Sequence, residues 1–69
     1  MNNAKLKTSD RLQRVLRVLK RGGAYSTRRL REAANIEAVS ATVSELRANG
    51  KRIECFRRGR LYYYMLARS

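Results

Sequence analysis

The stretch that decides the fold is "NIEAVSATVSELRANGKRI", residues 35–53. Within it Val39, Val43 and Leu46 stand at i, i+4 and i+7, a spacing that places three apolar side chains on one face of a helix. The Asn-Gly pair that follows is typical of a helix end, and the residues after it begin a strand-like segment. We therefore predict a helix over residues 38–49 with a β-hairpin after it.

The charge of this stretch contrasts with that of the whole chain. The 69 residues include 17 Lys+Arg against 5 Asp+Glu, for a net charge of +12. Yet residues 32–46 contain no Lys or Arg, and they contain the glutamates Glu32, Glu37 and Glu45. A basic excess of this size favours contact with nucleic acid over a generic solubilising surface. The acidic character of the predicted third helix therefore needs an explanation.

Size and residue types exclude several classes of protein. A chain of 69 residues is expected to be one domain, too small for a deep catalytic cleft beside a core. Histidine is absent and Cys55 is the single cysteine, which excludes a His-based metal site and an internal disulfide. We expect no enzyme activity, no catalytic residue, no metal and no cofactor. No apolar run reaches membrane-spanning length, so we expect no membrane contact. The single cysteine fits a reducing compartment. We therefore expect the protein in the cytoplasm, associated with the nucleoid, or in the host cytoplasm if it is phage-encoded.

Residues 1–8 are expected to form a flexible basic arm, and residues 9–67 a single domain. A helix is predicted over residues 10–21, capped by Thr8 or Ser9 and stopped by the Gly-Gly pair after it. Its apolar side chains recur at i, i+3, i+4 and i+7, namely Leu12, Val15, Leu16 and Leu19. Its arginines should gather on the opposite side, namely Arg11, Arg14, Arg17 and Arg21, with Lys20 at the edge.

A second helix is predicted in "TRRLREAAN", residues 27–35, after "AYS", which is long enough for a single β-bridge. Ser26 or Thr27 should cap this helix, and Asn35 should end it in the left-handed conformation. The side chains expected to face the core are Leu30, Ala33 and Ala34. Ile36 would be buried in the turn before the third helix.

The C-terminal part is predicted to be a hairpin of "KRIECFR" and "RLYYYML" around an Arg58-Gly59 turn. In that register Arg57 opposes Arg60, Cys55 opposes Tyr62 and Ile53 opposes Tyr64. One face would carry Ile53, Cys55, Tyr62, Tyr64 and Leu66, and the other Glu54, Phe56, Leu61, Tyr63 and Met65. Only one face can pack on the helices, and Cys55 is expected to be a small core residue.

The order helix, short strand, helix, turn, helix, hairpin resembles a winged helix-turn-helix domain. It is most similar to the N-terminal DNA-binding module of biotin repressors. The segments that carry the resemblance are "YSTRRLREAANI", "VSATVSELRANG" and "RI-x-C … GR-x-YY-x-L". The resemblance implies an α+β, mainly α fold, in which a three-helix bundle carries a C-terminal two-stranded β wing. It also implies a stand-alone module of bacterial or phage type.

In this family the third helix enters the major groove of DNA, and the wing tip contacts phosphate or the minor groove. The resemblance therefore implies base-facing positions at Glu37, Ala38, Ser40, Ala41, Ser44 and Arg47. It implies wing contacts at Arg57, Arg58, Gly59 and Arg60. The centre of the third helix departs from the family, because small residues, Ala41, Ser44 and Ala48, stand where longer polar side chains are common. Bidentate base contacts are largely lost, so we expect modest sequence preference.

The leading interpretation is a small regulator of modest sequence selectivity that binds double-stranded DNA and represses transcription. Phosphate contacts are expected from the arginines and lysines that flank the third helix, Arg14, Arg17, Arg28, Arg29, Lys51 and Arg52. We expect Glu32 and Glu45 to pair with Arg28, Arg29 or Arg47 rather than read bases. No small-molecule effector is expected.

Two alternatives remain open. In the first, the protein is a phage-type adaptor or inhibitor of a host nucleic-acid machine and binds its protein partner through Phe56, Leu61, Tyr63 and Met65. The same face would also serve a homodimer of the DNA-binding form. In the second, the protein binds RNA, with an exposed tyrosine stacking on bases. Charge reversal at the wing tip separates the first alternative from DNA binding, because an interaction through Phe56 and Tyr63 would survive it.

Overall fold

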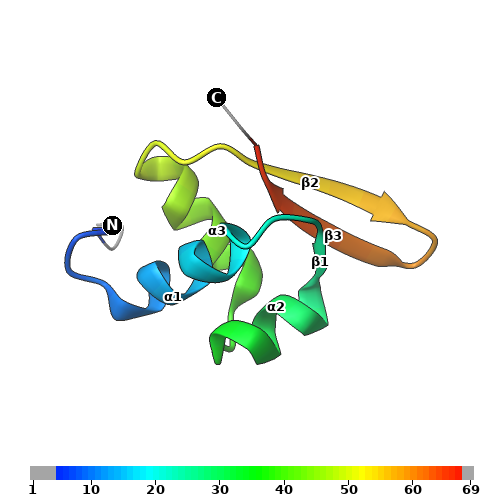
Figure 1. Cartoon of the computed structure of the whole chain (residues 1–69), viewed down its shortest axis with the longest axis horizontal. Helices are drawn as coiled ribbons and strands as arrows, with labels where there is room; N and C mark the ends of the chain where they lie inside the picture. The colour runs from blue at the N-terminus through cyan, green and yellow to red at the C-terminus, as the bar shows by residue number, and fades with distance from the viewer. Residues whose placement is uncertain (1–4, 68–69) are drawn as a thin grey trace.

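The computed structural model describes residues 5–67, and it is an α+β fold with three helices and a small antiparallel sheet (Figure 1). The fold class expected from the sequence is confirmed at this level. The elements follow one another in the order α1 (Asp10–Leu19), β1 (Tyr25–Ser26), α2 (Thr27–Ala34), α3 (Val39–Ala48), β2 (Ile53–Arg58) and β3 (Leu61–Leu66).

The first two helices begin at serine caps. The Oγ of Ser9 accepts a hydrogen bond from the amide of Leu12, and the Oγ of Ser26 accepts one from the amide of Arg29. Each cap satisfies a backbone donor that has no partner inside its helix. Helix α1 ends at Leu19, two residues before the predicted end, and its last turn is followed by Gly22 with a φ of 93°.

Helix α2 ends at Asn35, whose φ of 53° lies in the left-handed region, as predicted. Leu30 and Ala34 are buried, and Ile36 is buried in the turn that follows. The prediction that Ala33 faces the core is wrong, because its side chain is exposed. Ala33 lies one position, or about 100°, around the helix from Ala34, and only a narrow stripe of α2 reaches the core.

Helix α3 begins at Val39, one residue later than predicted, with no side-chain cap at Ala38. Its buried side chains include the predicted Val39, Val43 and Leu46, and also Thr42, which is fully buried. The polar side chain of Thr42 gives no sign in the sequence that it belongs to the core. Its hydroxyl is satisfied, since it donates to the carbonyl oxygen of Ala38 at 2.7 Å.

The sheet has three strands in the order β1-β3-β2, so the expected two-stranded wing is extended by a third, short strand. Strand β1 makes two residue pairs with β3 rather than a single bridge, Tyr25 with Tyr64 and Ser26 with Tyr63. The hairpin of β2 and β3 projects beyond the helices at one end of the molecule (Figure 1). Strand β1 anchors the base of this hairpin to α2.

The register of the hairpin differs from the predicted one by two residues. Arg57 pairs with Tyr62 and Cys55 with Tyr64, so the turn residues are Gly59 and Arg60 instead of Arg58 and Gly59. Gly59 has a φ of 63°, and Arg60 is not among the residues with positive φ. A turn with glycine in its first central position matches the type II′ geometry that suits a twisted hairpin. Because the shift is an even number, the two faces keep the predicted residues.

The core lies between the helices and the base of the sheet. Ile53 and Tyr64 are buried in it, and Leu66 packs against it, so this face of the hairpin is the inner one. The remaining core side chains come from the three helices and the turn between α2 and α3, namely Leu12, Val15, Leu16, Val18, Leu19, Leu30, Ala34, Ile36, Val39, Val43 and Leu46. Cys55 shares the inner face but is exposed, which corrects the prediction of a core cysteine. Cys55 lies on the edge strand β2, whereas its partner Tyr64 on the central strand β3 is the residue that reaches the core.

The segment before α1 is held against the domain where it is described. The amide of Leu6 donates to Oδ1 of Asn49 at 3.0 Å, and Nε2 of Gln13 donates to the carbonyl oxygens of Leu6 and Lys7 at 2.9 and 3.0 Å. Leu6 also packs against the core. Residues 5–8 of the expected arm thus include a turn that contacts the domain, and its first four residues lie outside the described part of the chain.

Candidate nucleic-acid interface

The outer face of α3 is a strip of small side chains. Ser40, Ala41, Ser44 and Ala48 are all exposed; Ser44 lies three residues after Ala41 and four from both Ser40 and Ala48, which places the set along one side of the helix. Glu37 and Ala38, just before the helix, are exposed as well. The structure thus brings five of the six predicted base-facing positions onto one accessible surface. Small side chains allow the backbone of this helix to approach another surface closely.

The acidic residue of α3 is neutralised by α1. Nη2 of Arg11 lies 3.1 and 2.9 Å from the two carboxylate oxygens of Glu45, and Nη1 donates to the hydroxyl of Thr42 at 2.6 Å. The exposed fractions of the Arg11 and Glu45 side chains are 35% and 19%. The prediction that Glu45 pairs with Arg28, Arg29 or Arg47 is therefore wrong.

The pairing predicted for Glu32 is confirmed, although the contact is long. Nε of Arg28 lies 3.7 Å from a carboxylate oxygen of Glu32, one helical turn away, and both side chains are mostly exposed. An ion pair of this kind in water contributes at most about 0.5 kcal/mol. Sequence spacing reveals such neighbours on one helix, whereas the partner of Glu45 comes from another element and has no such signal.

Arg47, the sixth predicted base-facing residue, points toward the start of β2. Its Nε and Nη2 donate to the carbonyl oxygen of Ile53 at 3.0 and 2.6 Å. This bidentate contact joins the C-terminal end of α3 to the start of β2. Arg47 therefore fixes the orientation of the helix relative to the hairpin, and a base contact from this side chain would have to break that link.

A hollow of about 480 Å³ lies beside the start of α3, between α1 and the turn that precedes α3. Arg14 borders it, with Nη1 3.0 Å from a carboxylate oxygen of Asp10 and Nη2 3.4 Å from the carbonyl oxygen of Asn35. The Nε of Arg14 is buried and has no hydrogen-bond partner among the described residues. Glu37 and Ala41 lie on the same rim, so Arg14 is next to the predicted base-facing strip.

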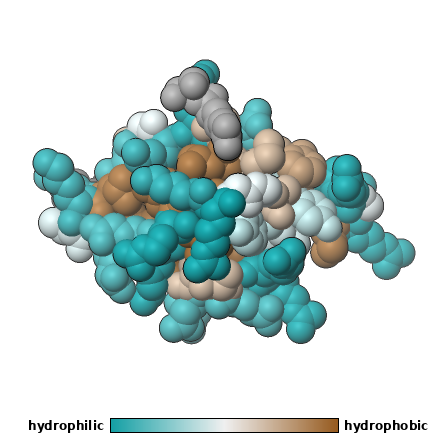
Figure 2. Space-filling model, in the orientation of Figure 1, coloured by the Kyte–Doolittle hydropathy of each residue, from teal (hydrophilic) through white to brown (hydrophobic). Residues whose placement is uncertain are grey.

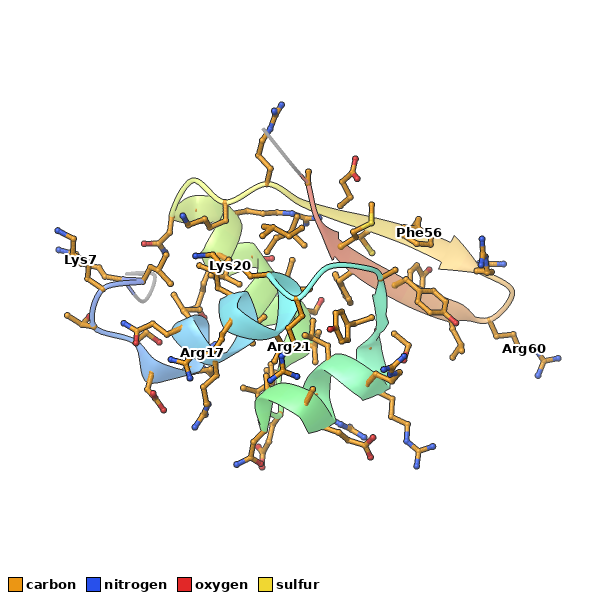
Figure 3. The ribbon with its side chains drawn as sticks, in the orientation of Figure 1. Lys7, Arg17, Lys20, Arg21, Phe56 and Arg60 are labelled. Atoms are coloured by element: carbon orange, nitrogen blue, oxygen red, sulfur yellow. The ribbon has the colours of Figure 1, made fainter. Side chains whose placement is uncertain are left out.

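The tip of the hairpin carries three exposed arginines, Arg57, Arg58 and Arg60. Nε of Arg57 donates to the carbonyl oxygen of Gly59 at 3.0 Å, which holds that side chain against the turn. Arg60 extends away from the rest of the molecule at one end of its long axis (Figure 3). The tip is thus a concentrated positive charge at the end of a β-ribbon.

The remaining predicted phosphate contacts are not brought together on one surface. The guanidinium of Arg29 lies 5.5 Å from the centre of the Tyr25 ring, a cation–π contact near the base of the hairpin. On α1, Arg14 borders the hollow beside α3, whereas Arg17 borders another on the opposite flank of the helix. Lys51 and Arg52 lie on the side of Arg17 rather than that of Arg14. The arginines predicted to gather on one side of α1 therefore diverge.

The outer face of the hairpin exposes aromatic and aliphatic side chains. The rings of Phe56 and Tyr63 are stacked, with centres 5.6 Å apart and planes inclined by 14°. Phe56 is 38% exposed and Leu61 53%, while Met65 is half-buried. Tyr62 is 51% exposed on the inner face near the tip. The predicted interface residues Phe56, Leu61, Tyr63 and Met65 do share one face.

Residues 5–67 contain no group of three or more Cys, Asp or Glu side chains close enough to hold a metal ion. Over the same residues no helix has the length and apolar character needed to cross a membrane. No protein-family model, curated protein or solved structure matches the chain.

Proposed function

We propose that this chain binds double-stranded DNA as a small transcriptional regulator of the winged helix-turn-helix type. In the proposed complex α3 lies in the major groove and the hairpin tip contacts phosphates or the minor groove. The observations that support this best are the exposed strip of Ser40, Ala41 and Ser44 on α3 and the three exposed arginines at the hairpin tip. The chain would repress by occluding a promoter.

The small side chains of α3 have a physical use in this proposal. Ala41 can contact a thymine methyl group, and Ser40 and Ser44 can bond to more than one base. Glu45 does not repel the DNA strongly, because Arg11 holds its carboxylate. A DNA-binding helix whose one cation, Arg47, is held by the carbonyl oxygen of Ile53 is therefore compatible with a strongly basic protein, provided that phosphate contacts supply the affinity and base contacts supply only a modest preference.

The wing tip would supply much of that affinity. The side chains of Arg58 and Arg60 make no hydrogen bond or ion pair with other described residues, so their guanidinium groups are available to phosphates or a narrow minor groove. Each phosphate that they neutralise would add roughly −0.9 to the slope of log affinity against log salt concentration.

The proposal is tested by the affinity for a labelled duplex DNA, measured by fluorescence anisotropy over a salt series. Replacing Arg58→Glu and Arg60→Glu should weaken binding strongly and reduce the steepness of the salt dependence by roughly 2, since two phosphate contacts are lost. The charge-matched control is Arg21→Glu with Arg31→Glu, because both are exposed and outside the proposed interface. Equal losses in the two double variants would show that only net charge matters.

A second candidate function is favoured by the outer face of the hairpin. The stacked Phe56 and Tyr63 beside the exposed Leu61 form an apolar surface suited to a protein partner or a second copy of the chain. Replacing Phe56→Ser and Leu61→Ser should then abolish partner binding and leave the affinity for duplex DNA unchanged. Loss of DNA binding in this variant would instead indicate that DNA binding requires a dimer formed through this face.

A further inference from the structure

A second basic surface lies on the flank of α1 that faces away from the proposed DNA contact. Two hollows, of about 360 and 230 Å³, lie next to each other there and share Leu16 and Lys20 in their walls. We call the two together the α1 groove. It runs from the segment before α1, across α1, to the loop after α3 and the end of β3.

The charged side chains that line the α1 groove are all positive. Its walls contain five cations and, among the described residues, no acidic side chain: Lys7, Arg17, Lys20, Lys51 and Arg52. None of the three ion pairs formed by described residues involves them. Figure 3 shows Lys7, Arg17 and Lys20 around α1, far from Arg60 at the other end of the long axis.

The α1 groove is also apolar between these cations. Leu16, which is only 6% exposed, lies in both hollows, with Leu6 at one end and Leu66 at the other. Leu6 and Leu66 are partly buried and pack against the core. Figure 2, in the same orientation, shows brown apolar surface between teal hydrophilic side chains.

The walls of the α1 groove are held in place by hydrogen bonds. Leu6 is tied to Asn49 at the end of α3, and Gln13 binds the carbonyl oxygens of Leu6 and Lys7. On the other side the amide of Lys51 donates to Leu46 and that of Ala67 donates to Arg52, at 3.0 and 2.8 Å. A ligand would therefore find the groove largely formed, which lowers the entropy lost on binding.

We infer that the α1 groove binds an acidic peptide segment of a partner protein, in which an apolar side chain is flanked by Asp or Glu. The carboxylates would pair with the cations of the rim, and the apolar side chain would cover Leu16 between Leu6 and Leu66. A nucleic-acid backbone fits less well, because contact with the leucines at the centre of the groove does not stabilise a bound phosphate. The two flanks of α1 differ, so such a partner leaves Arg14 and the outer face of α3 free.

The test uses three fluorescent probes with the full chain. One is a peptide with two leucines flanked by glutamates, the second has these leucines replaced by serines, and the third is a duplex DNA of random sequence. The central variant is Lys20→Glu, because Lys20 belongs to both hollows. Its matched control is Arg31→Glu, since Arg31 is also an exposed cation at the C-terminal end of a helix and lies outside the α1 groove. Circular dichroism confirms that both variants fold.

The leucine peptide should bind, and Lys20→Glu should weaken it about fivefold or more while Arg31→Glu changes it much less. Amide chemical shifts should move at Lys7, Leu16 and Lys20 in the unmodified chain. Equal affinity for the leucine and serine peptides, or equal losses in the two variants, would overturn the inference, because net charge alone would then explain binding. A loss of duplex DNA binding by Lys20→Glu as large as the loss of peptide binding would overturn it too, by assigning the groove to nucleic acid.

Peptide binding at the α1 groove does not depend on the DNA contact proposed for α3 and the hairpin tip, although Arg17, Lys51 and Arg52 of the groove are among the phosphate contacts expected from the sequence. If Arg58→Glu with Arg60→Glu abolishes DNA binding and leaves the leucine peptide bound, both proposals stand. If no variant affects DNA binding specifically, the DNA proposal fails while the peptide measurement still decides the role of the α1 groove.

Discussion

At the scale of single residues, Arg11 both neutralises the negative charge on α3 and helps to fix the position of this helix. It forms an ion pair with Glu45, it donates to the buried hydroxyl of Thr42, and it fixes α3 against α1. Local spacing predicts neither the neutralisation of Glu45 nor the burial of Thr42, because both depend on Arg11, which lies more than thirty positions away in the sequence. A tertiary contact therefore neutralises the helix on this side.

Replacing Arg11→Gln should lower the free energy of unfolding by about 1 to 2 kcal/mol, because the ion pair with Glu45 is lost and Thr42 loses a donor. The expected loss is small since the Arg11 side chain is partly exposed and its ion pair is screened by solvent. Urea denaturation measures the change. Arg28→Gln is the control, because the Arg28–Glu32 pair is long and exposed, and a loss as large as that of Arg11→Gln would contradict a special role for Arg11.

At the scale of the elements, the turn between α2 and α3 sets the angle at which α3 is presented. Asn35 ends α2 in the left-handed conformation, and Ile36 is buried immediately after it. Arg47 and the Ile53 carbonyl oxygen make the corresponding link at the other end of α3. The outer face of α3 is thus held at both ends, one by backbone conformation and one by a side chain.

Replacing Asn35→Ala should cost about 1 kcal/mol of stability, because alanine carries the steric penalty of the left-handed conformation. Asn35→Gly should cost little or nothing, since glycine adopts positive φ readily. Thermal unfolding of the two variants compares them directly. A glycine variant no more stable than the alanine variant would contradict the role of the left-handed backbone conformation at Asn35.

The elements also show which features of the fold can be predicted from the sequence and which cannot. Serine caps, the left-handed Asn35 and the two faces of the hairpin are predictable, because each follows from a local rule of spacing or dihedral preference. The hairpin register is not, because Arg58-Gly59 and Gly59-Arg60 are both acceptable turns and only the whole sheet decides between them. The α1 groove escapes prediction for a similar reason, since its walls come from four separate segments.

At the scale of the whole molecule, the net charge of +12 has two opposite consequences. Repulsion among the cations destabilises the free protein, and salt screens that repulsion. The same cations are expected to bind polyanions, and salt weakens that binding through counterion competition. Three ion pairs involving Asp10, Glu32 and Glu45 offset only part of the positive charge of the described residues.

Raising the salt concentration from low to physiological values should therefore raise the melting temperature of the free protein while it lowers the affinity for duplex DNA. Differential scanning fluorimetry and anisotropy, in the same buffers, measure the two effects. Adding duplex DNA at low salt should raise the melting temperature further, because a ligand of the folded state stabilises it by mass action. A free protein whose melting temperature falls with salt would contradict the idea that self-repulsion limits its stability.

DNA binding through α3 and the hairpin tip is tested most directly by selection from a random library of duplex DNA, with salt titrations of both the enriched and the starting pools. Both pools should bind near physiological salt with a steep salt dependence, and the enriched pool should show a short motif with a modest gain in affinity. Strong binding without any enriched motif would contradict base contact by α3. Absence of duplex binding near physiological salt would contradict the DNA-binding proposal as a whole.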